Sequence, residues 1–164
     1  MKGIDVQHQL HTEIEIDASP EDVWAILTDL PHYSEWNPFI VSSHGTVAVG
    51  QRLTNRLQQA GGKTRTFKPT VTIVDPPRTF EWLGHLGVPG IFDGRHRFEL
   101  TATRTGTHVA QIEQFSGLLV RIARRSLDQD TVGGFNAMNL ALKTRVEQRP
   151  VERPAATIPP GRAS

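Results

Sequence analysis

The clearest hydrophobic pattern in the chain lies between Ser126 and Glu147. Ser126 followed by Gln129 predicts a helix start, because hydroxyl and amide can satisfy free backbone N–H groups reciprocally, and Pro150 predicts the end. Six residues recur between them at spacings of three and four, which places them on one face of an α-helix: Leu127, Thr131, Phe135, Met138, Leu142 and Val146. This face has to be buried against another part of the protein.

Two adjacent glycines, Gly133 and Gly134, interrupt the predicted helix. Each glycine costs about 1 kcal/mol relative to alanine in a helix interior. The pair therefore indicates either that another group approaches the helix backbone closely or that the helix bends.

Near the N-terminus the polarity alternates with a period of two. Apolar and polar residues alternate from Leu10 to Ile16, which predicts a strand with one solvated face. Ser19 and Pro20 then predict the start of a helix, as N-cap and first helical residue. A second short helical segment is expected over Pro31–Trp36.

Further strands are predicted wherever strand-like segments are separated by glycine, proline and other turn residues. They are Phe39–Ser43, Gln51–Gln59, Lys63–Val74, Arg78–Leu86, Phe92–Thr103 and Thr107–Gly117. Short connections favour antiparallel neighbours. The order of elements predicts an α+β fold in which a curved antiparallel sheet wraps around the long C-terminal helix, with two short helices after the first strand.

Length and composition predict one domain with a short tail. The 164 residues suffice for a substantial core, and with no cysteine the chain has no disulfide, thiolate metal site or cysteine nucleophile. We expect a single domain over residues 1–147. Residues 148–164 contain four prolines and little apolar surface, so we expect them to be disordered.

The net charge of +1 divides unevenly between these two parts. Three arginines against one glutamate give residues 148–164 a charge of +2, which leaves −1 on residues 1–147. Because phosphate binding requires concentrated Lys and Arg, we do not expect nucleic acid as a partner.

The remaining composition favours a soluble cytoplasmic protein without a cofactor. No apolar run approaches the roughly 20 residues of a membrane span, and the first residues lack the apolar segment of a signal peptide. Nucleotide-binding and hydrolase motifs are absent. His8 and His11 point to opposite faces of a strand, so we expect no metal site.

Two long stretches of the sequence resemble a known superfamily. Ile16-Asp17-Ala18-Ser19-Pro20-Glu21-Asp22-Val23-Trp24-Ala25-Ile26-Leu27-Thr28-Asp29 followed by Tyr33-Ser34-Glu35-Trp36-Asn37-Pro38-Phe39 resembles the opening of the START-like, or SRPBCC, superfamily. Its members include bacterial polyketide cyclase/dehydrase-like proteins and the Bet v 1 allergens. The stretches 90–100, 113–117 and 135–139 look like one bacterial ligand-binding subgroup.

The resemblance covers about residues 10–147 and implies a helix-grip fold. It also implies a deep apolar cavity between the sheet and the long helix. It says little about the ligand, because this superfamily includes lipid carriers, hormone receptors, chaperone cofactors and cyclases on one scaffold.

Strand alternation predicts which side chains face that cavity. Residues two apart on a strand share a face, so His96 accompanies Phe98, Glu113 accompanies Phe115, and Glu81 turns outward beside Trp82. The predicted ligand-binding residues are Trp36, Asn55, Trp82, Phe92, His96, Phe98, Gln111, Glu113, Phe115, Gly134, Phe135 and Met138.

Glu113 and His96 are the candidate catalytic residues. A carboxylate among apolar side chains resists ionisation and becomes a usable general acid or base near neutral pH, and His96 could relay its proton. Such a pair suits aldol cyclisation or dehydration of a polyketone. Alternatively, the two residues satisfy each other or a buried water, or orient a polar group of a ligand.

Other residues are candidates for a lid over the cavity and for a lipid-binding surface. Trp36 and Phe92 could act as lids at the cavity mouth, beside the glycine-bracketed loop Gly87–Gly90. Arg121, Arg124 and Arg125 could meet an anionic lipid head group or a membrane surface, or form a solvated helix face.

Four functions remain open at this point. The leading hypothesis is a carrier or sensor that binds a small hydrophobic ligand such as a lipid, polyketide or aromatic compound. The second is a cyclase/dehydratase that uses Glu113 and His96 without metal or nucleotide. The third is a protein-interaction module, and the fourth is lipid handling at a membrane surface without integral membrane association. A homodimer is left open.

Overall fold

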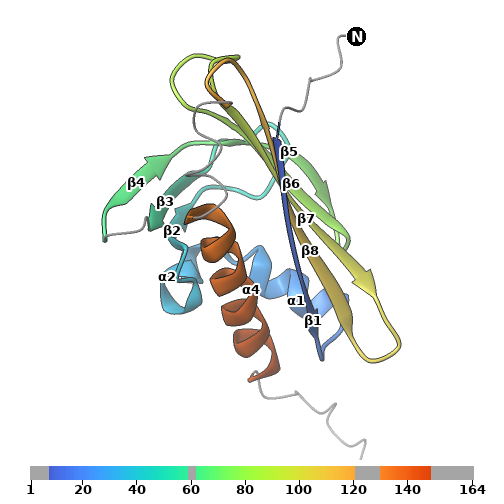
Figure 1. The fold of residues 1–164 in the computed structure, drawn as a ribbon. Helices are drawn as coiled ribbons and strands as arrows, with labels where there is room; N and C mark the ends of the chain where they lie inside the picture. Colours follow the sequence, from blue (N-terminus) through green and yellow to red (C-terminus); the bar gives the residue numbers. More distant parts are fainter. Residues whose placement is uncertain (1–7, 59–61, 121–129, 149–164) are drawn as a thin grey trace, which may run out of the picture.

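The computed structural model describes residues 8–58, 62–120 and 130–148 (Figure 1). Three short helical elements follow the first strand, and a long helix ends the described chain. The elements in chain order are β1 (His8–Ile16), α1 (Pro20–Leu27), the 3₁₀ turn η1 (Leu30–His32), α2 (Tyr33–Trp36), β2 (Ile40–His44), β3 (Thr54–Gln58), β4 (Thr64–Phe67), β5 (Thr70–Asp75), β6 (Thr79–His85), β7 (Asp93–Ala102), β8 (Thr107–Ser116) and α4 (Val132–Glu147).

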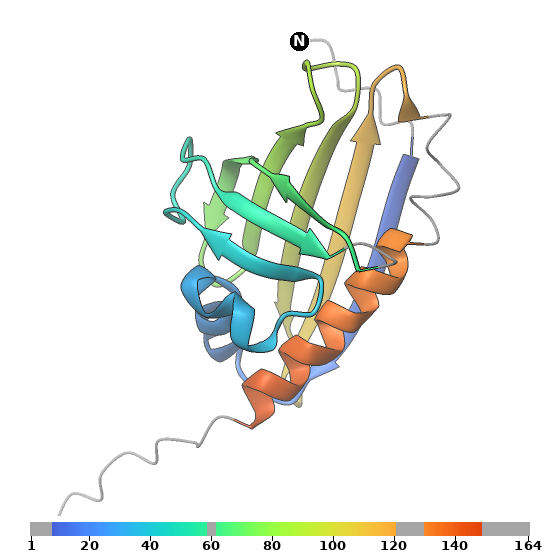
Figure 2. The same cartoon turned by 90° about the vertical axis from the view of Figure 1, so that its left-hand side faces the viewer.

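The strands form an antiparallel sheet in two hydrogen-bonded parts. Five strands follow the order β1-β8-β7-β6-β5, and three follow the order β2-β3-β4. A bridge between Arg52 and Thr70, with backbone hydrogen bonds between residues 50–53 and 69–71, links the segment before β3 to β5. Figures 1 and 2 show the strands curving around α4, which crosses the concave side. The predicted α+β helix-grip fold is confirmed.

One predicted strand is in fact two. The segment Lys63–Val74 divides at Lys68 and Pro69 into β4, which pairs with β3, and β5, which pairs with β6. Pro69 has no N–H to donate to a ladder, and its carbonyl instead accepts from the backbone N–H of Leu53 (2.8 Å). The division leaves β4 at the edge of the smaller part of the sheet.

The N-terminal helices follow the sequence signals closely. Ser19 caps α1 by accepting from the backbone N–H of Asp22 (3.2 Å), and Pro20 is the first helical residue, as predicted. The buried hydroxyl of Tyr33 donates to the carbonyl of Leu27 at the end of α1 (2.5 Å). This bond connects the start of α2 to the end of α1, and α2 leads directly into the segment that contains Phe39.

The long helix begins at Val132, and its predicted apolar stripe is buried at Phe135, Met138, Leu142 and Val146. The predicted cap at Ser126 and the arginines of residues 121–125 lie outside the described residues. No helix in the described ranges has the length and apolar character needed to cross a membrane.

A close approach explains one of the two glycines in this helix. A Cβ atom at Gly134 would lie 2.3 Å from the ring of Phe39, whereas a Cβ at Gly133 would meet nothing within 4 Å. Phe39 therefore packs directly on the helix backbone, and its ring also meets Phe135 edge to face at 5.5 Å. The group that approaches Gly134 is part of the protein itself.

The outer face of the larger part of the sheet holds a buried carboxylate, Glu81. It is fully buried, and it accepts hydrogen bonds from Thr72 (2.7 Å), Arg95 (2.6 Å) and Arg97 (2.7 Å). Burial alone would raise the pKa of Glu81, but these donors outweigh it and hold the pKa below the usual value. The cluster joins β5, β6 and β7 directly behind Trp82.

Replacing Tyr33 by phenylalanine tests the link between α1 and α2. The variant leaves the Leu27 carbonyl without its side-chain donor, so we expect Tyr33→Phe to lower the free energy of unfolding by about 1–3 kcal/mol. Urea denaturation measures the loss. Ser34→Ala, at the exposed neighbouring position, is the control. Identical midpoints for Tyr33→Phe and wild type would contradict the role of this bond.

The Glu81 cluster predicts a pH dependence of stability. Because the folded-state pKa lies below the reference value of 4.5, the stabilisation by ionised Glu81 is present above that value and is lost as pH falls through the folded-state pKa. Glu81→Gln lacks this contribution. We therefore expect the variant to be less stable than wild type at neutral pH and the difference to shrink below about pH 4.

Thermal denaturation at several pH values measures this difference. Glu13→Gln, which changes an exposed carboxylate on β1, is the matched control and should follow wild type. A difference between Glu81→Gln and wild type that stays constant down to acidic pH would show that Glu81 does not titrate as inferred.

Candidate functional site

The register of three neighbouring strands places three functional side chains in one row. Trp82 of β6 pairs with His96 of β7, and His96 pairs with Glu113 of β8. All three face the concave side of the sheet, because residues two positions away on each strand belong to the core. The row therefore presents an aromatic ring, an imidazole and a carboxylate side by side.

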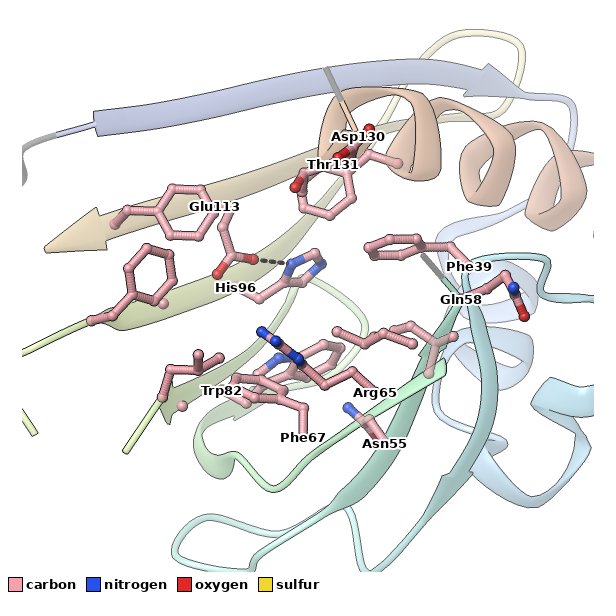
Figure 3. Close-up of a pocket in the computed structure, with 18 of the residues that line it drawn as sticks. Phe39, Asn55, Gln58, Arg65, Phe67, Trp82, His96, Glu113, Asp130 and Thr131 are labelled. Atoms are coloured by element: carbon pink, nitrogen blue, oxygen red, sulfur yellow. Dashed lines mark hydrogen bonds and ion pairs between the residues drawn. The ribbon is translucent and has the colours of Figure 1, made fainter. Parts of the chain in front are cut away.

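This row forms part of the wall of a cavity of about 570 Å³. Its volume lies within the usual range for small-molecule sites. The cavity is enclosed by strands of both parts of the sheet, the segment around Phe39 and the first residues of the long helix (Figure 3). It is lined by Phe39, Ile40, Asn55, Leu57, Gln58, Arg65, Phe67, Trp82, Gly84, Leu86, Phe92, Gly94, His96, Glu113, Phe115, Leu119, Asp130, Thr131 and Phe135.

His96 and Glu113 form a buried hydrogen-bonded pair. Nδ1 of His96 bonds Oε2 of Glu113, and the two residues are only 3% and 8% exposed. On the other side of the ring, the amide nitrogen of Gln111 lies 3.1 Å from Nε2 of His96. Because an amide nitrogen can only donate, Nε2 accepts, which assigns the imidazole proton to Nδ1 and makes it the donor to Glu113.

Aromatic rings hold the imidazole of His96 on several sides. Trp82 stacks on it at 4.8 Å with an angle of 8° between the rings. Phe98 lies at 4.7 Å, and Phe135 meets it edge to face at 5.0 Å. These ring contacts fix the position and the orientation of the imidazole beside the Glu113 carboxylate.

Two paired glycines create the space around this pair. Gly84 and Gly94 lie opposite each other on β6 and β7. They are two residues along from the Trp82–His96 pair and therefore on the same face of the sheet. A Cβ at Gly94 would lie 2.6 Å from Oε1 of Glu113, and a Cβ at Gly84 would lie 1.8 Å from the ring of Phe67. The missing side chains therefore admit the Glu113 carboxylate and the Phe67 ring to the cavity wall.

The smaller part of the sheet contributes polar groups from the opposite side. Asn55 is buried, and its Oδ1 accepts from Ser43 (2.7 Å). Arg65 lines the cavity from the edge strand β4, and in Figure 3 its side chain reaches into the space between β4 and the strands that carry Trp82 and His96. The cavity therefore has a cation on one wall and a carboxylate on another.

Seven of the predicted ligand-binding residues line the cavity, and five do not. The seven are Asn55, Trp82, Phe92, His96, Glu113, Phe115 and Phe135. Phe98, Gln111 and Met138 are buried behind this lining. Trp36 packs edge to face on Tyr33 at 5.1 Å, and Gly134 lies under Phe39. Contact of any of the twelve with a ligand stays a prediction.

The long helix contributes less to the cavity than predicted. Of its buried stripe only Phe135 lines the cavity, together with Asp130 and Thr131 just before the helix. Met138 accepts a hydrogen bond from Gln111 at 3.6 Å, and Leu142 packs into the core. Most of the helix therefore closes the core beneath the cavity.

Several lining residues are not among those predicted from the sequence, and Arg65 and Phe67 are the most informative of them. Both were inside a predicted strand, and Arg65 stands two residues before Phe67, so alternation alone placed them on one face. Gly94 likewise stands two residues before His96. Phe39 gave no such signal, because it lies outside the regular strands. Among the described residues, no group of three His, Asp or Glu side chains could hold a metal ion.

Solved structures of several bacterial proteins share this fold. Protein MLL2253 from Mesorhizobium loti is 23% identical, with a TM-score of 0.69 over 88% of this chain and 100% of its own. The Zhui aromatase/cyclase from a Streptomyces species is 18% identical, with a TM-score of 0.70 over 87% and 96%. The di-domain ARO/CYC StfQ from the steffimycin biosynthetic pathway is 13% identical, with a TM-score of 0.71 over 86% and 51%.

No curated protein matches the sequence. One family does: its description is polyketide cyclase / dehydrase and lipid transport, and the match extends over residues 7–147. That range contains every described element of the sheet, the short helices and α4, and it includes the whole cavity lining. The chain therefore belongs to the polyketide cyclase / dehydrase and lipid transport family.

Proposed function

We propose that the protein binds a small hydrophobic ligand in the cavity between the two parts of the sheet. The observation that carries this proposal is a cavity of about 570 Å³ whose wall is mostly aromatic and aliphatic. Filling it removes apolar ligand surface from water, which stabilises a complex by roughly 25 cal/mol per Å² of buried area before the costs of association.

The few polar groups in the wall would orient the ligand. Oε2 of Glu113 is held by His96, while Oε1 lies next to Gly94 on the cavity wall and accepts from a ligand donor. Arg65 offers donors from the opposite wall. A ligand with an apolar body and one or two oxygen functions fits this arrangement better than a pure hydrocarbon does.

The second candidate function is cyclisation or dehydration of a polyketone. It is favoured by the buried pair of Glu113 and His96, because Oε1 of the carboxylate lies at the cavity wall. The names of the aromatase/cyclases that share the fold also favour it. Oε1 of Glu113 would take the proton from a CH₂ group between two carbonyls, and the resulting carbanion would add to a third carbonyl of the same chain. The alkoxide formed by this addition takes the proton back from Glu113 and becomes a hydroxyl group. Glu113 then takes the second proton of the same carbon, and the hydroxyl group leaves as water with a proton from the Glu113–His96 pair, which forms a C=C bond.

A cavity-filling variant tests ligand binding. The neutral fluorescent probe N-phenyl-1-naphthylamine should bind wild type, and Leu57→Trp should weaken binding about tenfold or more, because the larger ring occupies the space that Leu57 borders. The fluorescence titration is repeated with Leu140→Trp, the same exchange at a helix position that is 61% exposed. Equal binding by both variants would show that the probe does not use the cavity.

A carboxamide at position 113 separates catalysis from carriage. If Glu113 is the general base, Glu113→Gln should turn over a poly-β-keto substrate about 10²–10⁴ times more slowly than wild type, because the amide accepts no proton. Product formation is followed by chromatography, with Glu21→Gln as the exposed control. Equal rates for wild type and Glu113→Gln would end the enzymatic proposal and leave ligand binding intact.

A further inference from the structure

A second hollow adjoins the cavity at the edge of the sheet. This groove lies between β4 and the loop after β6, and it shares three lining residues with the cavity: Arg65, Phe67 and Leu86. The full lining is Arg65, Thr66, Phe67, Lys68, His85, Leu86 and Gly87. The groove and the cavity are therefore separated by a few side chains.

No strand pairing closes the sheet at this point. Within the described residues β4 pairs only with β3, and β6 pairs with β5 and β7. The ring of Phe67 fills the gap by lying on Gly84, and no hydrogen bond fixes an apolar ring. Movement of the shared lining side chains, Phe67 among them, would join the groove to the cavity without breaking a strand pairing, whereas an entrance through a ladder would break backbone hydrogen bonds.

The groove is positively charged. Lys68 is exposed, and neither Lys68 nor Arg65 forms an ion pair with a described residue. Across the groove, Nδ1 of His85 bonds Asp93 (2.6 Å), which leaves Nε2 on the other edge of the ring. Asp93 also accepts from the backbone N–H of Gly90 (2.9 Å), so this carboxylate is engaged by two groups beside the groove.

The charge around the groove extends along the chain. Residues 36–74 contain Arg52, Arg56, Lys63, Arg65 and Lys68 and not one aspartate or glutamate. All five cations are exposed. A run of five unopposed positive charges in 39 residues, in a protein whose net charge is +1, concentrates positive potential on β3 and β4 beside the groove.

We propose that this groove is the entrance of the cavity and binds the anionic end of an amphiphilic ligand whose apolar part lies inside. The proposal rests on the proposed ligand-binding function and adds the class of ligand. Lys68 and Arg65 donate to the anion, which is a carboxylate or a phosphate ester, and Leu86 and Phe67 contact the first part of the apolar chain.

Three probes of equal chain length test this. Dodecanoate and dodecyl phosphate, below their micelle concentrations, and 1-dodecanol, below its solubility limit, are titrated against protein loaded with N-phenyl-1-naphthylamine. We expect the two anions to displace the probe at lower concentration than the alcohol. Lys68→Gln should weaken displacement by the anions about fivefold to tenfold and leave the alcohol unchanged, because it removes one charge-assisted contact.

Arg104→Gln is the matched control, since Arg104 is an exposed cation on the turn between β7 and β8 and lines neither hollow. It should behave as wild type with all three probes. Added salt should reduce the advantage of the anions, because the cations at the groove are exposed. Whichever anion displaces the probe at the lower concentration identifies carboxylate or phosphate as the preferred anionic group.

The remaining outcomes distinguish the two proposals. If the alcohol and the anions displace the probe equally, or if Lys68→Gln weakens all three alike, the anionic subsite is overturned and ligand binding stands. The subsite is also overturned if no amphiphile displaces a bound probe. If N-phenyl-1-naphthylamine itself does not bind wild type, both proposals fail together.

Discussion

The register of β6, β7 and β8 is the constraint on which the site depends. Side chains on a strand alternate between faces. A slip of β7 by one residue relative to β6 and β8 would therefore turn His96 outward while Trp82 and Glu113 stay inside. The Glu81 cluster on the opposite face opposes such a slip. Its bonds to Arg95 and Arg97 join β6 to β7 at the positions that flank His96. The same two strands are thus fixed from both faces.

A carboxylate within an apolar wall requires local compensation. Burying a charge costs several kcal/mol unless hydrogen bonds satisfy it, and His96 supplies one to Glu113. Gln111 fixes the tautomer that makes this bond possible, although its own Oε1 is buried without a partner. Gln111, His96 and Glu113 therefore form one chain of hydrogen bonds across β7 and β8, and Oε1 of Glu113 remains at the cavity wall.

The sequence predicted the faces of strands better than their partners. Alternation around Phe98 and Phe115 placed His96 and Glu113 inside, and capping residues located α1, because both signals are local. The contact between His96 and Glu113 was not predictable, since it requires the register of two strands. The resemblance of residues 16–39 to a superfamily supplied the helix-grip topology, which local patterns alone do not contain.

A net charge taken over the whole domain does not show how the charges are distributed along it. The near-neutral charge of residues 1–147 concealed the unopposed cations of residues 36–74, which come together only because β3 and β4 are neighbours. Likewise, Gly134 was predicted as a ligand-binding residue, and in the structure Phe39 lies against it. For Gly134 the missing information was the identity of a neighbour distant in sequence, whereas the run of cations is visible in the sequence once charge is counted by segment.

The distribution of charge also sets the direction in which a ligand would lie. An anionic group that entered the cavity fully would approach the Glu113 carboxylate in an apolar environment, where like charges repel strongly. The same group at the groove meets Arg65 and Lys68 instead, in contact with water. Attraction at the proposed entrance and repulsion from Glu113 therefore favour a single orientation for such a ligand, with its anion at the groove and its neutral part against Glu113 and His96.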